Sequence, residues 1–193
     1  MSHPIPDTPG PQRPVVPIPA SLAHLPTVGG LAVPWITLAT PEGRYVFGAI
    51  DADRQRFCLY ERRCKICGFA LTQPFLLLAR HIDLTRQLSA EPGLHPWCAG
   101  YTTRACPMLS GHLEHYRRSD RDLAHLLQIP SESIHREPAS QTQSRRGALV
   151  GAWFTVWLNA YRVIQDDLAH SLAASFEHHP VLRVRRVAEQ VIS

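Results

Sequence analysis

The chain has 193 residues, of which 45% are hydrophobic and 19% charged, and its formal net charge is +4. This length and apolar content predict one domain with a substantial core. No apolar run approaches the roughly 20 residues that a membrane helix needs, and no signal peptide is visible, so we expect a cytoplasmic protein with no membrane partner. Five cysteines, four of them grouped with a histidine, indicate metal binding rather than a disulfide framework.

The first part of the chain predicts an arm, a hairpin and a short helix. Residues 1–30 are rich in proline, which excludes a helix or an inner strand, so we predict a disordered Pro-rich arm. Two apolar runs, residues 31–38 and 45–47, flank a turn and predict a β-hairpin. Asp51 is placed to cap a helix that runs to Glu61.

Two pairs of metal-binding residues follow. Cys64 and Cys67 form a Cys-x2-Cys pair, and His95 and Cys98 form a second pair with the same spacing. Two ligands separated by two residues reach one ion when the backbone between them turns tightly, and Gly68 gives the freedom for such a knuckle. The four residues predict a tetrahedral Cys3His zinc site. Because four protein ligands leave no open position, we expect the zinc to be structural.

The second pair is predicted to lie at the start of a helix. Pro96 suits the first helical position because its missing N–H would be unpaired there, which places His95 before the helix and Cys98 in its first turn. With a β-hairpin through residues 75–78, the arrangement predicts a treble-clef-like zinc module over residues 60–110.

The fourth ligand has an alternative, Cys106. It lies eight residues after Cys98, which is about 12 Å along an uninterrupted helix and too far to share an ion. If Pro107 ended the helix early, Cys106 would replace His95 in the zinc shell. The fifth cysteine, Cys58, stands among apolar neighbours and is predicted to be a buried, inert thiol.

Three short motifs follow one another between residues 64 and 109. They are Cys64-x2-Cys67-Gly68, Ala90-Glu91-Pro92-x2-His95-x2-Cys98-Ala99 and Ala105-Cys106-Pro107-Met108-Leu109. This order resembles an uncharacterised family of small bacterial and phage-encoded proteins with the pattern C-x-x-C-G, AEP-x-x-H-x-x-C-A and ACP-F-L, and the upstream Val33-Pro34-Trp35 also fits. The chain departs from the pattern at Met108, where the family has Phe. The resemblance implies no known activity, but it implies that Cys106 belongs to the pattern.

The remainder of the chain predicts helices and a linker. A capped helix is expected to end before Pro130, and residues 131–147, which are polar and without periodicity, predict a linker. Residues 148–193 predict a mainly helical segment that packs on the core, although the β-branched and aromatic residues at its start are typical of a strand. The fold class is therefore α+β, with a core over residues 31–130 that contains a small sheet and the zinc module.

Two basic clusters lie near the predicted zinc ligands. Arg62, Arg63 and Lys65 lie at the knuckle, and Arg117 and Arg118 follow the predicted zinc helix. Either cluster suits phosphate groups, which dominate nucleic-acid affinity, but each also fits a solvated helix face. The first functional hypothesis is therefore a zinc-binding protein that binds nucleic acid or another protein.

The second hypothesis is a metal- or cysteine-dependent enzyme. Such an enzyme would be a hydrolase whose zinc ion has only three protein ligands, or one in which Cys106 is the nucleophile. A third form would bind a small molecule in the groove between the zinc helix and the segment with Trp153 and Trp157. A nuclease needs a second metal site, of which residues 80–83 supply only a part. The sequence assigns no catalytic residue.

Overall fold

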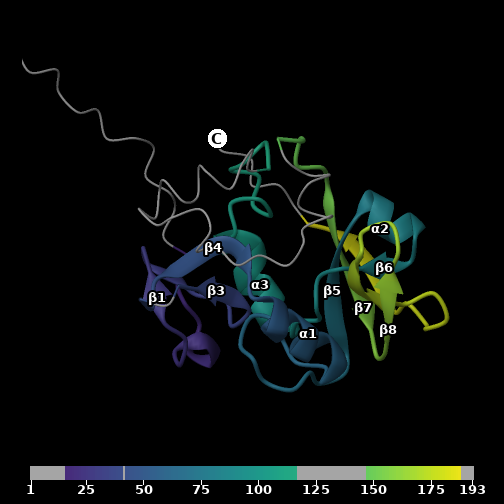
Figure 1. Cartoon of the computed structure of the whole chain (residues 1–193), viewed down its shortest axis with the longest axis horizontal. Coiled ribbons are helices and arrows are strands. Elements are labelled where there is room, and N and C mark those ends of the chain that lie inside the picture. The colour runs from purple at the N-terminus through teal and green to yellow at the C-terminus, as the bar shows by residue number, and fades with distance from the viewer. Residues whose placement is uncertain (1–15, 41, 117–146, 188–193) are drawn as a thin grey trace, which may run out of the picture.

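Small antiparallel sheets and a few helices build the described part of the protein, which is residues 16–40, 42–116 and 147–187 of a computed structural model (Figure 1). The helices are the 3-10 turn η1 (Ala20–Leu22), α1 (Ala52–Tyr60), α2 (His81–Thr85) and α3 (Pro96–Ala105). The strands are β1 (Thr27–Val28), β2 (Leu31–Ala32), β3 (Thr37–Ala39), β4 (Tyr45–Ile50), β5 (Phe75–Arg80), β6 (Leu88–Ser89), β7 (Trp153–Leu158), β8 (Arg162–Asp166), β9 (Ser171–Ser175) and β10 (Arg183–Arg186). The predicted α+β class is confirmed at this coarse level.

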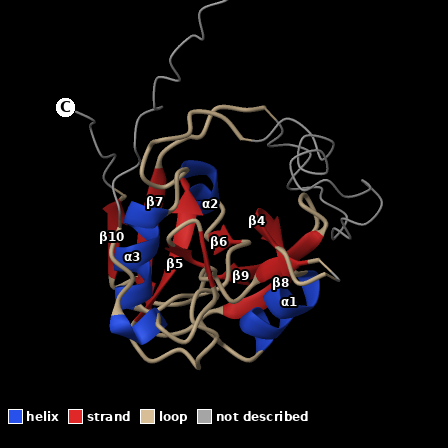
Figure 2. Cartoon of the chain, turned by 90° about the vertical axis from the view of Figure 1, so that its left-hand side faces the viewer, coloured by secondary structure: helices blue, strands red, loops and turns tan. Residues whose placement is uncertain are grey.

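The strands form two three-stranded sheets and two short ribbons. The first sheet has the order β10-β7-β5 and the second the order β6-β9-β8, while β1 pairs with β2 and β3 pairs with β4. All the pairings are antiparallel. Figure 2 shows β10 on one side of the molecule and α1 and β8 on the other. None of the described helices is long and apolar enough to span a membrane.

Strand β5 separates two apolar clusters. Leu76 and Leu78 face the cluster that contains α3, whereas Phe75, Leu77 and Ala79 face the cluster beneath α1 and β9. A strand that is buried on both faces reads as a continuous apolar run instead of an alternating one, which is why its sequence is Phe-Leu-Leu-Leu-Ala. The strand thereby connects the region of the predicted metal ligands to the rest of the core.

The partner of β5 differs from the prediction. A local hairpin through residues 75–78 was expected, but β5 pairs with β7, so that Leu77 lies opposite Val156. An isolated bridge between Leu76 and Leu94 and a hydrogen bond from the Ser89 hydroxyl to the carbonyl oxygen of Leu78 at 2.6 Å join β5 to the segment before α3. The strand at this position is confirmed, its predicted hairpin is wrong, and the treble-clef arrangement stays a prediction.

The proline-rich segment is folded in its second half. Val16, Leu22 and Leu25 are buried in the cluster that contains the cysteines, and the N–H of Ala32 donates to the hydroxyl oxygen of Tyr101 at 2.9 Å. The predicted disordered arm is therefore wrong for residues 16–30, because leucines at a few positions anchor a segment whose prolines exclude longer elements. Residues 1–15 lie outside the described ranges.

The predicted hairpin is confirmed in part, and the predicted first helix is confirmed. Strand β3 pairs with β4, with Thr37 opposite Ile50, but Leu31–Ala32 at the start of the apolar run forms β2 and pairs with β1 instead. The side chain of Asp51 accepts a hydrogen bond from the backbone N–H of Arg54 at 3.0 Å and so caps α1 as expected. This helix delivers the chain to Cys64.

The C-terminal part contains strands where helices were predicted. Strands β7 to β10 occupy most of residues 153–186, and β7 lies between β5 and β10 in its sheet. The inner residues Val156 and Leu158 are fully buried. Because β7 is partly covered on both faces, its apolar residues do not alternate with polar ones. Their spacing is therefore also compatible with a helix, which is why a helix was predicted. The predicted helix before Pro130 and the linker 131–147, apart from Gly147, lie outside the described residues.

Candidate metal centre

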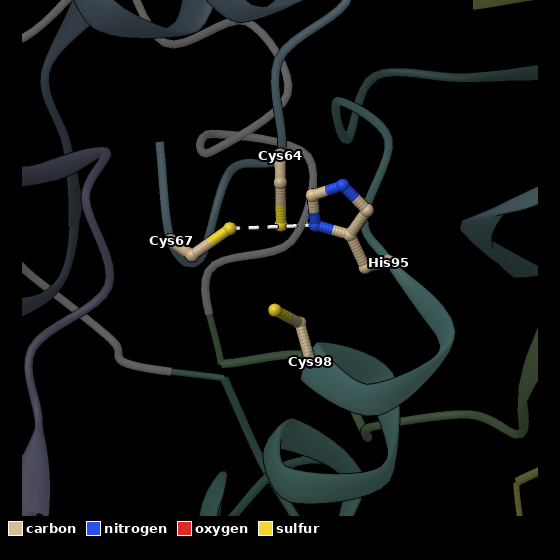
Figure 3. A group of neighbouring side chains, drawn as sticks. All are labelled: Cys64, Cys67, His95 and Cys98. Carbon is tan, nitrogen blue, oxygen red and sulfur yellow. Dashed lines mark hydrogen bonds between the residues drawn. The ribbon is translucent and has the colours of Figure 1, made fainter. Parts of the chain in front are cut away.

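The two predicted ligand pairs meet at one point (Figure 3). Cys64 and Cys67 flank a tight turn in which the N–H of Gly68 donates to the carbonyl oxygen of Cys64 at 2.8 Å. Gly68 has a φ of +77°, in the left-handed region that favours glycine. His95 is the N-cap residue of α3 and Cys98 lies in its first turn, as predicted from Pro96.

The distances in this group fit a single metal ion. The three sulfur atoms and one ring nitrogen lie within 4.8 Å of one another, and all four side chains are buried. A tetrahedral zinc ion with bonds of about 2.0 to 2.3 Å has ligand atoms about 3.5 to 3.8 Å apart. The Sγ atom of Cys67 and the Nδ1 atom of His95 are already 3.4 Å apart. A small adjustment of the side chains therefore accommodates the ion.

The orientation of the His95 ring is fixed from outside the group. Its Nε2 atom lies 2.9 Å from the carbonyl oxygen of Ala70, to which an N–H at that position donates. In the neutral ring the Nδ1 atom is then left without a proton, and it points at the cysteines, which is the tautomer that a metal ligand needs. The ring of Trp97 stacks face to face on the His95 ring, with centroids 4.4 Å apart.

Without an ion, the protonation of the four groups is strongly interdependent. Burial opposes ionisation of Cys64, but hydrogen bonds with Cys67, Cys98 and His95 lower the pKa of Cys64 below its ordinary value. The hydrogen bond with Cys64 raises the pKa of Cys67 to about 11, and the same kind of contact raises the pKa of Cys98. For His95, burial opposes the charged form, and the interaction with Cys64 nonetheless raises its pKa. Hydrogen bonding within the group thus favours a thiolate at Cys64 and neutral thiols at Cys67 and Cys98.

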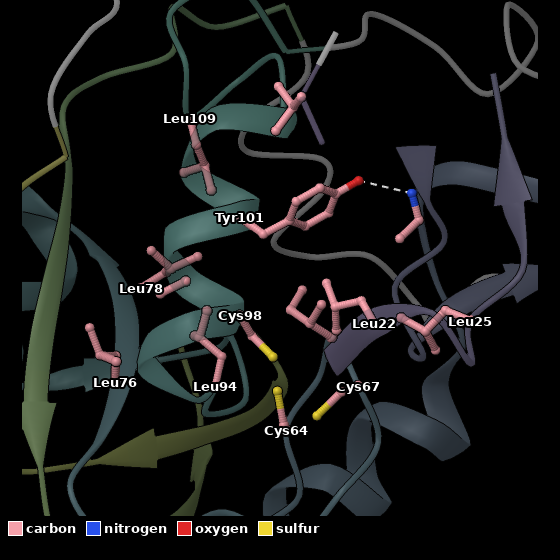
Figure 4. Close-up of a cluster of buried hydrophobic side chains, with 14 of the residues drawn as sticks. Leu22, Leu25, Cys64, Cys67, Leu76, Leu78, Leu94, Cys98, Tyr101 and Leu109 are labelled. Atoms are coloured by element: carbon pink, nitrogen blue, oxygen red, sulfur yellow. Dashed lines mark hydrogen bonds between the residues drawn. The ribbon is translucent and has the colours of Figure 1, made fainter. Parts of the chain in front are cut away.

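The group also forms part of the core. Figure 4 shows Cys64, Cys67 and Cys98 beside Leu22 and Leu94. These apolar neighbours exclude water from the sulfur atoms, and they come from the N-terminal segment and from the segment that precedes α3. An ion that draws the four ligands together would therefore also fix the packing of this apolar cluster.

The other two cysteines lie outside the group. Helix α3 continues to Ala105, so Cys106 is its C-cap and the early helix end that would bring Cys106 to the site does not occur. Cys106 is half-buried and is absent from the four-residue group. Cys58 is fully buried, and burial raises the pKa of its thiol to about 12, as expected of an inert cysteine.

The predicted basic cluster before the module is largely engaged within the protein. Lys65 is only 7% exposed and its Nζ atom forms an ion pair with Glu91 at 2.7 Å, so it is not available to a phosphate group. Arg63 donates to the carbonyl oxygen of Gly68 at 3.2 Å, and Arg62 donates to that of Tyr161 at 3.3 Å. Arg117 and Arg118 lie outside the described residues. Lys65 was therefore wrongly assigned to a nucleic-acid site.

A cavity of about 310 Å³ lies beyond the end of α3, and because no residue of α3 lines it, it coincides only in part with the groove predicted between that helix and the segment with Trp153 and Trp157. It is lined mainly by apolar residues that include Leu109, Trp153 and Val187, but not Trp157. Glu114 is the one carboxylate among the described lining residues.

The predicted nuclease residues at 80–83 are not a metal site, because Asp83 accepts hydrogen bonds from Arg80 at 2.8 and 2.6 Å.

Two features of the site carried no interpretable signal in the sequence. The acceptor for His95 is a backbone carbonyl group, which any residue at position 70 would supply. The partner of Lys65 is Glu91, which stands in the second motif, but nothing in that motif indicates an ion pair.

Comparisons of the chain with protein-family models, with curated protein sequences and with solved structures found no match. The resemblance to the small bacterial and phage-encoded proteins therefore stays a prediction.

Proposed function

We propose that the protein binds one zinc ion through Cys64, Cys67, His95 and Cys98, and that this ion is the structural scaffold of a binding module. The observation that carries the proposal is the convergence of three sulfur atoms and one ring nitrogen within 4.8 Å, all on buried side chains. The pairs come from opposite ends of a segment of about thirty residues, so closure by an ion fixes the path of the chain between them.

The chemistry of the ligands favours zinc. Thiolate and imidazole groups are preferred by zinc among the common divalent ions, and carboxylate or water ligands, which suit magnesium or calcium, are not part of the group. A tetrahedral shell of three sulfur atoms and one nitrogen atom is a frequent arrangement in structural zinc sites.

Burial of the ligands favours a structural role over a catalytic one. All four side chains are at most 3% exposed, and four protein ligands leave no position for water or substrate. The ion would join the turn after α1 to the first turn of α3. Such sites contribute apparent binding energies on the order of 10 kcal/mol, which is comparable to the stability of a whole domain.

A module held in this way binds a macromolecule in our proposal, with nucleic acid or a protein as the partner. The enzyme alternative is favoured only by the cavity beside the end of α3. Its lining brings Glu114 but no second titratable group from the described residues, whereas acid–base or nucleophilic chemistry requires at least a matched pair.

Metal analysis of the purified protein tests the proposal. We expect one zinc per chain by mass spectrometry of the metal content. Replacement by cobalt should give the intense visible absorption of a tetrahedral thiolate site. Cys98→Ser should abolish both signals, while Cys106→Ser should retain them as the matched control. A folded protein without bound metal, or loss of zinc in Cys106→Ser alone, would contradict the proposal.

A further inference from the structure

Arginine side chains stacked on aromatic rings surround α1. The four pairs, with the distance from the guanidinium carbon to the ring centroid, are Arg54 and Trp35 at 5.2 Å, Arg56 and Tyr60 at 5.7 Å, Arg62 and Tyr161 at 5.5 Å, and Arg63 and Phe57 at 5.1 Å. At one significant cation–π pair per 70–80 residues, about two would be expected in the described part of the chain. The pairs are therefore both frequent and concentrated in one place.

Several of these rings are open to solvent. Phe57 is 42% exposed and Tyr60 is 52% exposed, on the side of α1 that faces away from the buried Cys58 and Leu59. A helix turns by about 100° per residue, so Arg56, Phe57 and Tyr60 share that outer side. We define the α1 platform as Trp35, Arg54, Arg56, Phe57, Tyr60 and Arg63.

The α1 platform is attached to the candidate metal centre. The rings of Trp35 and Phe57 are 6.0 Å apart, and Arg63 connects Phe57 to the carbonyl oxygen of Gly68. A Cβ atom placed on Gly68 would lie 2.7 Å from Trp35, so the knuckle is packed directly against the platform. The position of the platform thus depends on the turn that the zinc ion closes.

We propose that the α1 platform binds single-stranded nucleic acid, with bases stacked on Phe57 and Tyr60 and a phosphate group paired with the exposed Arg56. This inference rests on the proposed structural zinc. Unpaired bases stack on exposed aromatic rings and on guanidinium planes. Such stacking depends little on the nucleotide sequence, because every base has a flat face. A duplex hides the faces of its bases and leaves only its phosphate groups to the arginines.

The charges of this surface favour stacking over phosphate attraction. Asp53 and Glu61 are exposed on the same helix, and Asp51 lies 3.9 Å from Arg54 as its ion-pair partner. At a slope of about −0.7 per neutralised phosphate for single strands, one or two contacts give a slope of only about −1 in a plot of log affinity against log salt concentration. We therefore expect the binding affinity to depend weakly on salt concentration and strongly on the aromatic rings.

Fluorescence anisotropy with labelled oligouridine and oligothymidine, and with a duplex of the same length, tests the proposal on the zinc-loaded full chain. Phe57→Leu and Tyr60→Leu keep apolar volume but remove the flat ring, and each should weaken single-strand binding at least about fivefold. Phe57→Trp should retain binding. Arg56→Ala should weaken binding and reduce the salt slope, whereas Arg185→Ala, on β10 at the opposite side (Figure 2), should change neither.

Three results would overturn the inference: no binding by the folded, zinc-loaded protein, equal binding of the duplex, or unchanged affinity in both leucine variants. The first would assign the platform to a protein partner instead. Zinc content is measured on the same samples. A metal-free protein that binds through Phe57 and Tyr60 would contradict the structural zinc but support the platform, so the two failures are distinguishable.

Discussion

The Nε2 atom of His95 and the carbonyl oxygen of Ala70 are 2.9 Å apart, and this contact links the two halves of the candidate metal centre before any ion binds. Ala70 follows the knuckle that carries Cys64 and Cys67, whereas His95 belongs to the pair at the start of α3. The knuckle therefore orients the ligand contributed by the other segment. Contacts of this kind set the tautomer of a ligating histidine and affect metal affinity.

The first prediction separates the two candidates for the fourth ligand. His95→Ala removes a ligand and also leaves the Ala70 carbonyl without its donor, so zinc content and thermal stability should fall together. Cys106→Ser should leave the zinc content unchanged and lower the free energy of unfolding by at most about 1 to 3 kcal/mol. Metal analysis and thermal denaturation measure both quantities. The opposite order of the two variants would make Cys106 the ligand.

The second prediction concerns the contact between the knuckle and Trp35. Gly68→Ala introduces a Cβ atom 2.7 Å from the indole ring, at a φ of +77°. The backbone conformation alone should lower the free energy of unfolding by about 1 to 2 kcal/mol, and the overlap should add about 1 to 3 kcal/mol. Chemical denaturation of the zinc-loaded protein measures the difference.

Gly43→Ala is the matched control for this overlap. Gly43 has nearly the same φ, +79°, and a Cβ atom there would meet nothing within 4 Å. It should therefore show the backbone cost without the steric one. Equal destabilisation of the two variants would mean that Trp35 moves aside freely and that the knuckle is not packed tightly against the platform.

The ligand residues could be predicted because their signal is local. The x2 spacing, Gly68 and the position of Pro96 each constrain the backbone within a few residues, and the structure brings Cys64, Cys67, His95 and Cys98 together as these constraints require. The capping of α1 by Asp51 follows from an equally short-range rule. None of these inferences depends on how distant segments pair.

The sheets could not be predicted in the same way, because their order depends on distant pairings. Strand β5 pairs with β7, which begins more than seventy residues after β5 ends, and no turn residue between them specifies the pairing. The continuous apolar run of β5 and the two tryptophans of β7 lack the alternation that distinguishes a strand from a helix. Burial of Lys65 likewise follows from the position of Glu91 in the folded chain.

The third prediction concerns the ion pair between Arg86 and Asp166, which joins the end of α2 to the end of β8. Arg86 donates two hydrogen bonds to the carboxylate, at 3.0 and 2.5 Å, and the Asp166 residue is only 3% exposed. Burial opposes the charge, but Arg86 and the backbone N–H groups of Leu168 and Ala169 lower the pKa of Asp166 below its ordinary value. Asp166→Asn should lower the free energy of unfolding by about 2 to 4 kcal/mol at neutral pH.

The effect of Asp166→Asn should depend on pH in a defined direction. Because the folded-state pKa is lowered, the stabilisation is complete above the pKa of an unfolded aspartate, about 3.9, and is lost as the pH falls through the folded value. Denaturation curves of the two proteins should therefore converge below about pH 4. Asp167→Asn, at the exposed neighbouring position, is the matched control for the amide substitution. A constant difference at all pH values would mean that the amide acts through packing.

The fourth prediction tests how the N-terminal segment is attached to α3. The hydroxyl oxygen of Tyr101 accepts a hydrogen bond from the buried N–H of Ala32 at 2.9 Å. Tyr101→Phe keeps the ring but leaves this N–H without its acceptor, so the free energy of unfolding should fall by about 1 to 3 kcal/mol. The amide of Ala32 should also exchange faster with deuterium. Tyr60→Phe, at a position that is 52% exposed, should change stability by no more than about 0.5 kcal/mol. If exchange at Ala32 is unchanged in Tyr101→Phe, the segment is held by its other contacts, such as the packing of Leu22 and Leu25, and the hydrogen bond to α3 contributes nothing to its order.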